Sequence, residues 1–322
     1  MNDADAPSPN NPITGSTSPG VPASESLDRG SRQVMITRYS RANQDTAAGV
    51  CNITSRRDDV TIEEPLEIRI VTHSNDNQSS KDQHSDDQSR LERSISVTMR
   101  TPGHDVELAL GFLVGEGIIQ NPEDVHRVRS FSHDIVRVEM APGHQFDLGS
   151  LQRHFFTSSS CGVCGKTSID ALHRILPVGQ SNSQPRISDE LIYSLGERLR
   201  DSQSVFDRTG GLHASGLFTV DGKMIAIRED VGRHNALDKL IGATWFSTPE
   251  YLSDAVLCLS GRVSFELLQK SAMVGIPIIV AVGAPSTLAI ELAAQAGITL
   301  VGFVRSDRFN VYTGPERINT DR

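Results

Sequence analysis

Cysteine is scarce in this chain, with four residues among 322. That number excludes the small secreted folds that disulfide bonds hold together. Cys51 and Cys258 stand alone, and Cys258 lies in the apolar run 255–259. We interpret both as small buried hydrophobic side chains. Cys161 and Cys164 differ from them because they form a pair.

The sequence also lacks long hydrophobic runs, and no run approaches the length of a membrane-spanning helix. The first residues do not show the basic start, apolar core and cleavage site of a secretory signal. We therefore expect a cytoplasmic protein without a membrane partner. Lys and Arg (31) are fewer than Asp and Glu (40), which gives a net charge of −9. This balance disfavours a nucleic-acid partner but allows a local cationic pocket for one phosphorylated cofactor.

Two stretches have little apolar sequence. Residues 1–32 are rich in Ser, Pro, Asn, Asp and Gly, which predicts a disordered tail. Residues 74–93 are polar and separate two predicted strands, 60–71 and 94–100. Pro65 marks an edge or a bend in the first of these strands. The polar insert 74–93 is therefore predicted to be a long hairpin loop.

The rest of the chain predicts an α/β protein with two domains. We expect a smaller β-rich N-terminal domain over 33–150 and a C-terminal domain over 151–322. In the first, Asp105 is predicted to cap a helix that runs to about residue 119, and strands follow at 125–128 and 135–140.

In the second half, apolar strands alternate with helices, which indicates parallel pairing in a sheet buried on both faces. Ligands bind at the carboxyl ends of such strands. Asp221-Gly222 favours a tight hairpin turn between two of the strands. The predicted strands are 217–220, 223–227, 255–259, 276–282 and 299–304, and the predicted helices are 188–200, 235–244, 264–273 and 286–296.

The cysteine pair is the most informative feature of the sequence. Cys161 and Cys164 lie in a loop of small residues, and Lys166 with the start of a following helix favours their thiolate forms. A pair with this spacing can bind a metal, exchange a disulfide or carry sulfur as a persulfide. A structural zinc site usually shows a second ligand pair, and this chain has none at a recognisable spacing. The residues alone leave these three chemistries open, together with a pair that has no chemical role, and they do not favour sulfur transfer.

The loop Cys161-Gly162-Val163-Cys164-Gly165 resembles that of the formate dehydrogenase accessory sulfur carriers, the FdhD family. Further segments match this family in the same order along the chain. They are Thr101-Pro102-Gly103-His104-Asp105, Gly111-Phe112-Leu113 with Glu116-Gly117, Thr209-Gly210-Gly211-Leu212-His213, residues 228–239 (REDVGRHNALDK), and residues 301–308 (VGFVRSDR) with Val311-Tyr312.

This resemblance implies a sulfurtransferase that acts through a cysteine persulfide. Members of the family accept sulfur from a cysteine desulfurase and pass it to the molybdenum cofactor, bis(molybdopterin guanine dinucleotide), before its insertion into formate dehydrogenase. Cys161 would hold the persulfide, and Cys164 would assist transfer, resolve the persulfide or be partly redundant. The cofactor would be cargo, with no structural metal. The family also implies a homodimer and a three-layer C-terminal domain similar in fold to the cytidine deaminases.

The resemblance also implies a cofactor-binding segment at the end of the last predicted strand. Arg305 and Arg308 offer guanidinium donors for diphosphate oxygens, although solvated surface arginines are the common alternative. The loop Ser260-Gly261-Arg262 follows another strand, and its N–H groups are candidates for a second phosphate. The implied segment consists of Phe303, Val304, Arg305, Ser306, Asp307 and Arg308.

Several residues of the matching segments are candidates for the lining of a cavity under the cysteine loop. His213 or His234 is expected to move a proton during sulfur transfer. The alternative is a core histidine and an ordinary charged helix start. The candidates are His213, Glu229, Asp230, Arg233, His234 and Arg262.

Other functions fit the residues less well. A zinc deaminase needs His-x-Glu followed by Pro-Cys-x-x-Cys, whereas His213-Ala214-Ser215 lacks the Glu and the cysteine pair precedes the histidine. The main alternative is a thiol–disulfide oxidoreductase that uses Cys161 and Cys164. A third function, a nucleotide-binding assembly chaperone, would not need Cys161.

Overall fold

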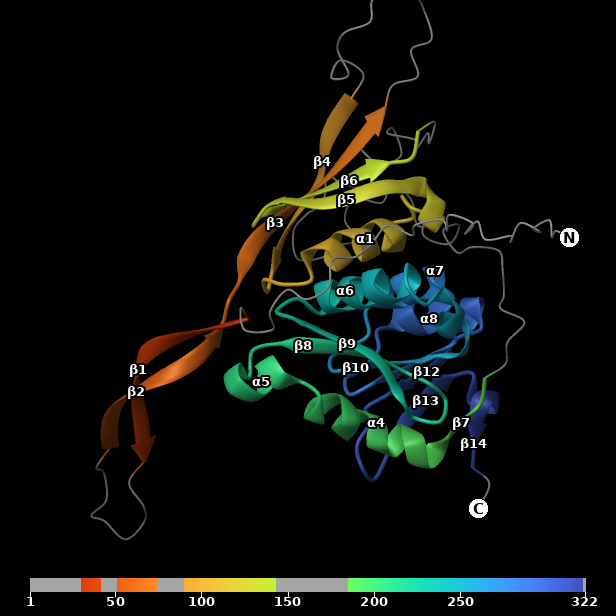
Figure 1. The fold of residues 1–322 in the computed structure, drawn as a ribbon. Helices are drawn as coiled ribbons and strands as arrows, with labels where there is room; N and C mark the ends of the chain where they lie inside the picture. The colour runs from red at the N-terminus through yellow and green to blue at the C-terminus, as the bar shows by residue number, and fades with distance from the viewer. Residues whose placement is uncertain (1–29, 42–50, 74–89, 143–184, 321–322) are drawn as a thin grey trace, which may run out of the picture.

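The computed structural model of the chain describes residues 30–41, 51–73, 90–142 and 185–320. In Figure 1 these residues form stacked layers: a four-stranded sheet, a layer of helices, a six-stranded sheet and a further helix beneath it. The protein therefore has the α/β class expected from the sequence.

The six-stranded sheet contains the three predicted parallel strands at its centre. Strands β10 (Val256–Leu259), β11 (Ile278–Ala281) and β12 (Thr299–Gly302) pair in parallel, and antiparallel strands flank them on both sides. Every residue of these three strands is buried, as their wholly apolar sequences predict. In sheet order the strands are β13 (Asn310–Thr313), β12 (Thr299–Gly302), β11 (Ile278–Ala281), β10 (Val256–Leu259), β8 (His213–Phe218) and β9 (Met224–Asp230). The turn between β8 and β9 has Gly222 at φ 86°, where the sequence predicts a tight hairpin.

Helices cover both faces of this sheet. Leu257 and Ile279 pack in a cluster with the upper helices, while their neighbours Val256 and Ile278 pack against the lower one. This alternation follows from the two-residue period of a strand. The upper helices are α6 (Arg233–Trp245), α7 (Phe265–Met273) and α8 (Thr287–Ala296). On the lower side lie α4 (Asp189–Asp201) and the short α5 (Ser204–Thr209), and only α4 was predicted.

The four-stranded sheet lies above helix α1 (Asp105–Gly115) in Figure 1. Two predictions for this region were wrong. The predicted strand 60–71 is two strands, with a break at residues 62 and 63, and Pro65 is the second residue of the later one. The polar insert is also shorter than expected, because residues 90–93 belong to a strand and 74–89 lie outside the described residues. The sheet order is β4 (Arg90–Arg100), β3 (Glu64–His73), β6 (Ile135–Met140) and β5 (Val125–Ser132).

The predicted cap of helix α1 was also wrong. His104, at φ 59°, precedes the first helical residue and makes no side-chain cap. The Asp105 carboxylate instead accepts hydrogen bonds from Arg100, from Nε at 2.8 Å and from Nη2 at 2.9 Å. Arg100 is 1% exposed, so a buried guanidinium takes the carboxylate that sequence reasoning assigned to the backbone. The helix ends at Gly115, four residues before the predicted end.

The upper and lower parts of the molecule join where helix α1 packs on helix α6. A Cβ atom on Gly111 would lie 1.8 Å from the carbonyl oxygen of Asp238, and one on Gly242 would lie 1.9 Å from that of Glu107. Only glycine allows this backbone approach. One hydrophobic cluster consequently extends from Leu66 in the upper sheet to Leu300 in the lower sheet.

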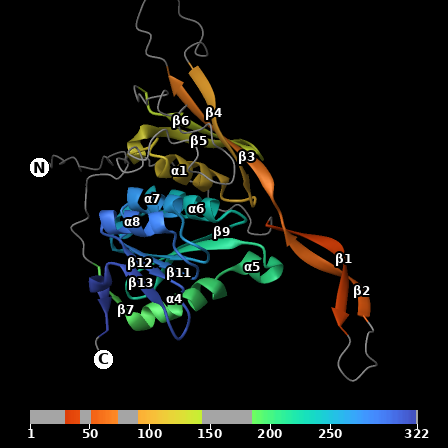
Figure 2. The same ribbon diagram turned by 180° about the vertical axis from the view of Figure 1, so that it is seen from behind.

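Two strands form a ribbon that projects from the rest of the molecule (Figures 1 and 2). Strand β1 (Ser31–Arg41) pairs antiparallel with β2 (Cys51–Thr61) over their full lengths. Residues 31 and 32, which were predicted to end a disordered tail, therefore belong to a strand, while residues 1–29 lie outside the described part. The ribbon meets the body at Thr61, whose hydroxyl donates to Thr209 Oγ1 at 3.1 Å.

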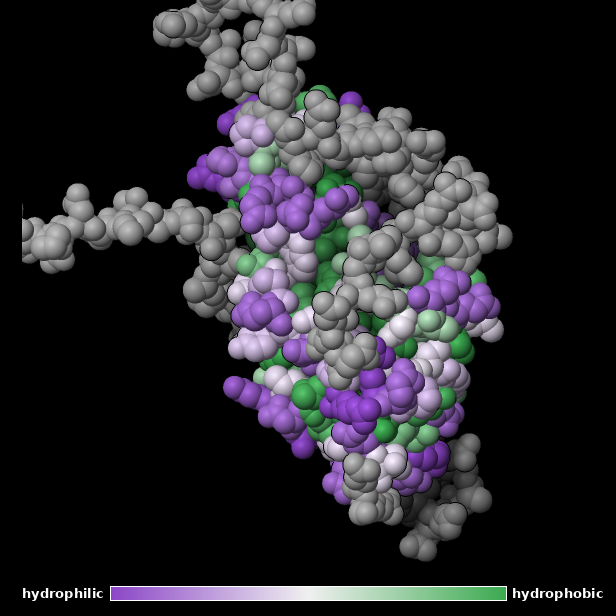
Figure 3. All heavy atoms as spheres, turned by 90° about the vertical axis from the view of Figure 1, so that its right-hand side faces the viewer, coloured by the Kyte–Doolittle hydropathy of each residue, from purple (hydrophilic) through white to green (hydrophobic). Residues whose placement is uncertain are grey.

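One side of the described molecule carries both hydrophilic and hydrophobic residues. Figure 3 shows hydrophilic residues spread over the side of the molecule to the right of Figure 1, with hydrophobic residues visible between them near its centre. None of the helices in the described ranges is both long and apolar enough to span a membrane.

Short elements complete the described chain. They are β7 (Ile187–Ser188), β14 (Ile318–Asn319) and the 3-10 turns Pro122–Asp124, Pro249–Asp254 and Pro315–Arg317.

Candidate functional site

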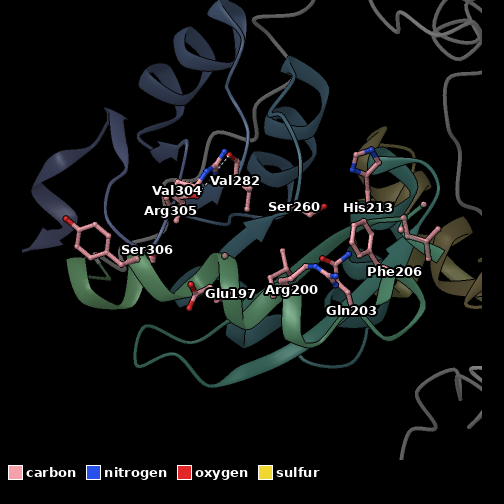
Figure 4. Close-up of a pocket in the computed structure, with 16 residues that line it drawn as sticks. Glu197, Arg200, Gln203, Phe206, His213, Ser260, Val282, Val304, Arg305 and Ser306 are labelled. Carbon is pink, nitrogen blue, oxygen red and sulfur yellow. Dashed lines mark hydrogen bonds between the residues drawn. The ribbon is translucent and has the colours of Figure 1, made fainter. Parts of the chain in front are cut away.

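A cavity of about 580 Å³ lies at the carboxyl edge of the central parallel strands. Val282 follows β11 and Ser260 follows β10, so both lie at the edge where ligands bind in parallel sheets. His213 begins the antiparallel strand β8 and therefore reaches the same edge. Figure 4 shows Glu197 and Arg200 of helix α4 across the cavity from Val282 and Ser260. The cavity thus lies between helix α4 and the strand ends.

Backbone hydrogen bonds join the three loops at this edge. The Gly283 N–H donates to the Gly261 carbonyl oxygen at 3.1 Å, and the Phe303 N–H donates to that of Gly283 at 3.1 Å. A Cβ atom on Gly283 would lie 2.7 Å from the nitrogen of Arg262, so glycine is required for this contact. Phe303 has φ 55°, a conformation that non-glycine residues rarely adopt. These loops therefore hold the edge of the cavity in one conformation.

Gln203 provides a buried polar group in the cavity lining. Its side chain is 2% exposed, and its amide Nε2 has no hydrogen-bond partner in the part of the chain that the structure describes. An enclosed donor without an acceptor is destabilising unless a ligand or water satisfies it. Arg200 lies nearby with its guanidinium carbon 4.2 Å from the centre of the Phe206 ring. Apolar walls with a few polar groups are typical of small-molecule sites.

The predicted cofactor-binding segment divides between the cavity and the outer surface. Val304, Arg305 and Ser306 line the cavity, and Phe303 is 41% exposed beside them. The Arg305 Nη1 donates to the carbonyl oxygens of Val282, at 2.9 Å, and of Val304, at 2.6 Å. This arginine therefore ties two loops together and is not wholly free for phosphate. Asp307 and Arg308 are outside the lining and form an exposed ion pair at 3.1 Å.

His213 is the predicted histidine that reaches the cavity. Burial and the positive charges of Arg233 and Arg262 lower the pKa of its imidazole, although Asp230 has the opposite effect. A Cβ atom on Gly261 would lie 3.2 Å from the His213 Nδ1, so this glycine allows the ring to approach the loop. Its neutral form is therefore favoured, as a proton acceptor requires.

His234 lies outside the cavity lining, as do Arg233 and Arg262. The His234 Nε2 is 3.1 Å from Ser264 Oγ and 3.1 Å from Glu266 Oε2. Burial, followed by Arg233, lowers the pKa of His234 to about 4. A neutral ring whose Nε2–H donates to the carboxylate is consistent with this contact.

Two acidic residues of the matching segment stabilise the fold instead of lining the cavity. The Glu229 carboxylate accepts from the N–H groups of Val205, at 3.1 Å, and Phe206, at 3.0 Å, and so holds the start of helix α5. The wholly buried Asp230 pairs with the Lys239 Nζ at 2.7 Å and also accepts from the N–H groups of Thr101 and Gly232. Neither residue is part of the lining of this cavity. The cysteine loop lies outside the described residues, so the expected cavity beneath it stays a prediction.

The structure describes the four cysteines to different extents. Cys51 begins strand β2, but its side chain lies outside the described part, so its predicted burial stays a prediction. Cys258 is completely buried, as predicted, and burial raises the pKa of its thiol to about 12. Cys161 and Cys164 lie outside the described residues, so their roles stay predictions. Within the described ranges, no three His, Cys, Asp or Glu side chains group as metal ligands.

Sequence reasoning missed the contribution of helices α4 and α5 to the site. Glu197, Arg200, Gln203 and Phe206 line the cavity but lie outside every matching segment. Their local pattern is that of an ordinary amphipathic helix and a polar turn, which gives no functional signal. The unpartnered amide of Gln203 becomes informative only once the surrounding packing is known.

Comparisons with known proteins agree with the fold. The solved structure of a proposed formate dehydrogenase accessory protein from Desulfotalea psychrophila superposes with a TM-score of 0.61 at 23% identity, covering 89% of this chain and 99% of that one. Two similar proteins are both described as sulfur carrier protein FdhD. The one from Streptomyces coelicolor is 44% identical over 276 residues, which is 83% of this chain and 91% of its own length. The one from Mycobacterium tuberculosis is 41% identical over 278 residues, 83% and 94% of the two chains.

The sequence pattern of the FdhD/NarQ family matches residues 90–319, well over half of the chain. This range includes the helices between the two sheets, the six-stranded sheet and every residue that lines the cavity. The chain therefore belongs to the FdhD/NarQ family.

Proposed function

We propose that this protein is a sulfur carrier for the maturation of a molybdenum-dependent formate dehydrogenase in the cytoplasm. The observation that carries the proposal is the extent of similarity to curated sulfur carriers, which are 44% identical over 83% of this chain. The family match over residues 90–319 includes the cavity-forming elements and Cys161.

In this proposal Cys161 is the sulfur-carrying nucleophile. Its thiolate attacks the outer sulfur of a persulfide on a cysteine desulfurase, the donor S–S bond breaks, and the donor cysteine leaves as a thiolate. The outer sulfur of the persulfide on Cys161 would then pass to the molybdenum of the cargo cofactor, while the S–S bond breaks and Cys161 leaves as a thiolate. The sulfur gains two electrons when it becomes a sulfido ligand, and molybdenum in its reduced state would supply them as part of the substrate. Cys164 assists this transfer or resolves a persulfide that has not been delivered. The chain would act as a homodimer, as the resemblance implies.

The cavity between helix α4 and the strand ends is the proposed position of the cargo cofactor. The buried Gln203 amide can donate to a polar ring, and the guanidinium of Arg305 lies in the lining beside that of Arg200, which also pairs with Asp207. These residues fit a large phosphorylated heterocycle, whereas a purely apolar ligand would leave the amide unsatisfied. The flanked parallel sheet is also consistent with the cytidine-deaminase-like arrangement that we propose for the C-terminal half.

Sulfur transfer can be tested with isotopically labelled cysteine and a cysteine desulfurase. We expect non-reducing mass spectrometry to find one labelled sulfur on Cys161 of the wild-type protein and none in Cys161→Ala. Cys258→Ser is the matched control, because its buried thiol with raised pKa is expected to take up no sulfur.

Two results would contradict the proposal. Retention of label by Cys161→Ala would remove Cys161 as the carrier. A Cys161–Cys164 disulfide without retained sulfur would instead favour the thiol–disulfide oxidoreductase.

A further inference from the structure

The ammonium of Lys270 lies between two carboxylates in the layer of upper helices. Its Nζ is 2.7 Å and 2.8 Å from the two Asp238 oxygens and 3.5 Å from Glu116 Oε1. Asp238 is 2% exposed and Lys270 is 6% exposed, whereas the side chain of Glu116 is 30% exposed. These three residues, the charge cluster, join helix α6, helix α7 and the end of helix α1.

Two segments that the proposed sulfur transfer does not use meet at Lys270. Asp238 belongs to the matching segment 228–239, and Phe112 and Glu116 belong to the matching segment of helix α1. The Lys270 Nζ is 5.1 Å from the centre of the Phe112 ring. A Cβ atom on Gly115 would lie 2.9 Å from the Lys270 Cγ, so the lysine stem lies directly against helix α1. Groups from all three helices therefore enclose the lysine.

The charge cluster has one positive and two negative groups. Asp230 does not change this balance, because its carboxylate contacts the Lys239 Nζ at 2.7 Å. Glu266, one turn before the lysine in helix α7, is 3.1 Å from the His234 Nε2. Within the described ranges, one carboxylate charge of the cluster is therefore uncompensated at neutral pH. A charge without a partner in the interior is destabilising.

A proton on Asp238 would remove the excess charge. Glu116 is close enough to hold the ammonium when Asp238 is neutral, so no buried charge would be left alone. Burial raises the pKa of Asp238 to about 6, and Glu116 and Asp230 add to this effect, whereas Lys270 opposes it. Burial acts against the charge of Lys270, but Asp238 and Glu116 raise its pKa, so the ammonium stays charged. Asp238 is therefore the group that takes up the proton.

We propose that the charge cluster is a pH-sensitive clamp, in which proton uptake by Asp238 tightens the packing of helix α7 against α6. Detachment of α7 would expose Asp238 to water, where its pKa has the ordinary value of 3.8. Because the packed state has the higher pKa, falling pH favours it, and a rise of pH through about 6 weakens it.

The clamp extends to the edge of the cavity. Residues 260–264 connect strand β10 to helix α7, so this loop moves with the start of the helix. The Gly261 carbonyl oxygen accepts from the Gly283 N–H at 3.1 Å, in the set of contacts that holds the strand-end loops together. Tighter packing of α7 is therefore expected to order this loop as well.

This inference goes beyond the proposed function, because the clamp requires neither Cys161 nor sulfur transfer. His234 opposes the clamp in an overlapping range of pH. Its ring contacts Glu266 of helix α7, and burial lowers its pKa to about 4. Detachment of α7 would allow the ring to take up a proton, so falling pH favours detachment through this residue. The clamp is therefore measured in His234→Gln, where the opposing effect is absent.

Hydrogen exchange with mass spectrometry of full-length His234→Gln tests the clamp. After correction for the intrinsic effect of pH, we expect amides of residues 260–273 to exchange about tenfold more slowly at pH 5 than at pH 7. This factor follows from pKa values of about 6 and 3.8 for Asp238 in the packed and detached states. Helix α4, on the opposite face of the sheet, is the internal reference and should change less than about twofold.

Two further substitutions in the His234→Gln protein identify the groups of the clamp. Asp238→Asn imitates the protonated carboxyl and should abolish the difference between pH 5 and pH 7. Glu116→Gln should reduce the difference, because Glu116 raises the pKa of Asp238. Glu291→Gln is the matched control, since Glu291 is exposed on helix α8 and the change of charge is the same. It should keep the full difference.

Three results would overturn the clamp. They are equal exchange of residues 260–273 at the two pH values, a difference that persists after Asp238→Asn, and an equal change in helix α4, which would mean that the whole protein is stabilised. If Asp238→Asn does not fold, the partly exposed Glu116 decides, because an undiminished difference in Glu116→Gln excludes the clamp. Cys161→Ala should keep the difference even if the sulfur-transfer experiment fails.

Discussion

At the scale of single residues, His234 shows how a neighbourhood sets the state of a side chain. The ring lies beside Arg233 and within reach of Lys270 and His213, while Glu266 and Ser264 contact its Nε2. Burial, followed by the charges of Arg233 and Lys270, lowers its pKa to about 4. His234 is therefore neutral at physiological pH, and a proton relay would use it as an acceptor.

This lowered pKa makes a prediction for stability against pH. Between pH 6.5 and about 4, His234 is protonated in the unfolded chain but not in the folded chain. His234 therefore lowers the free energy of unfolding as pH falls through this window. Asp238 acts in the opposite direction, because burial raises its pKa to about 6. We expect His234→Gln to lose less stability than the wild-type protein between pH 6.5 and 4.5. Denaturant unfolding at several pH values measures the loss of stability of the two proteins.

The control for this prediction is His133→Gln, since the side chain of His133 is 81% exposed. That variant should follow the wild-type pH dependence. An identical pH dependence for His234→Gln and the wild-type protein would show that His234 is not neutralised by its surroundings.

At the scale of elements, helices α1 and α6 lie between the two sheets and pack closely against each other. Gly111 and Gly242 each face a backbone carbonyl of the opposite helix, with no room for a Cβ atom. A buried ion pair lies beside this contact, with the Lys270 Nζ 2.7 Å and 2.8 Å from the two Asp238 oxygens. Small residues therefore decide the separation of helices α1 and α6, and the ion pair joins α6 to its other neighbour, α7.

We expect Gly242→Ala to lower the free energy of unfolding by about 1 to 3 kcal/mol, because the added methyl forces the two helices apart. Gly196→Ala is the matched control in helix α4, since its Cβ would meet Val282 at an ordinary 3.6 Å. That substitution should be neutral or stabilise by up to about 1 kcal/mol. Chemical denaturation compares the variants, and equal unfolding midpoints would refute the close contact.

At the scale of the whole molecule, the body and the ribbon differ in how they are stabilised. The body has a hydrophobic cluster that extends across the expected boundary at residue 150, from Leu66 to Leu300. The ribbon exposes Met35, Tyr39 and Ile53, each by at least 60%. Two-stranded ribbons without such a core are marginally stable in water.

We therefore expect amide hydrogens of strands β1 and β2 to exchange on the order of 100-fold faster than those of β10, β11 and β12. Hydrogen exchange with mass spectrometry of the full-length protein measures this difference. The β3–β4 hairpin is the internal control, because it has the same antiparallel pairing but packs on helix α1, and it should show intermediate protection. Equal protection of ribbon and central strands would mean that another surface covers the ribbon.

Local sequence patterns were sufficient to predict the elements that a single segment of the chain forms. The central strands were predicted because their residues are all apolar, and Ser188 was placed at the start of a helix, where its Oγ accepts from the Leu191 N–H at 3.2 Å. The hairpin at Asp221-Gly222 was predicted for the same reason, since its turn residues are adjacent in the chain.

The sequence by itself thus determined the α/β class, the buried central strands and the similarity to a family of sulfur carriers. Only the tertiary structure decided the rest. It placed Gln203 without a partner in the cavity, and it brought Arg233 and Arg262 close enough to His213 to lower the pKa of its imidazole. The physical reason is distance along the chain, because these contacts join segments whose local patterns carry no information about each other.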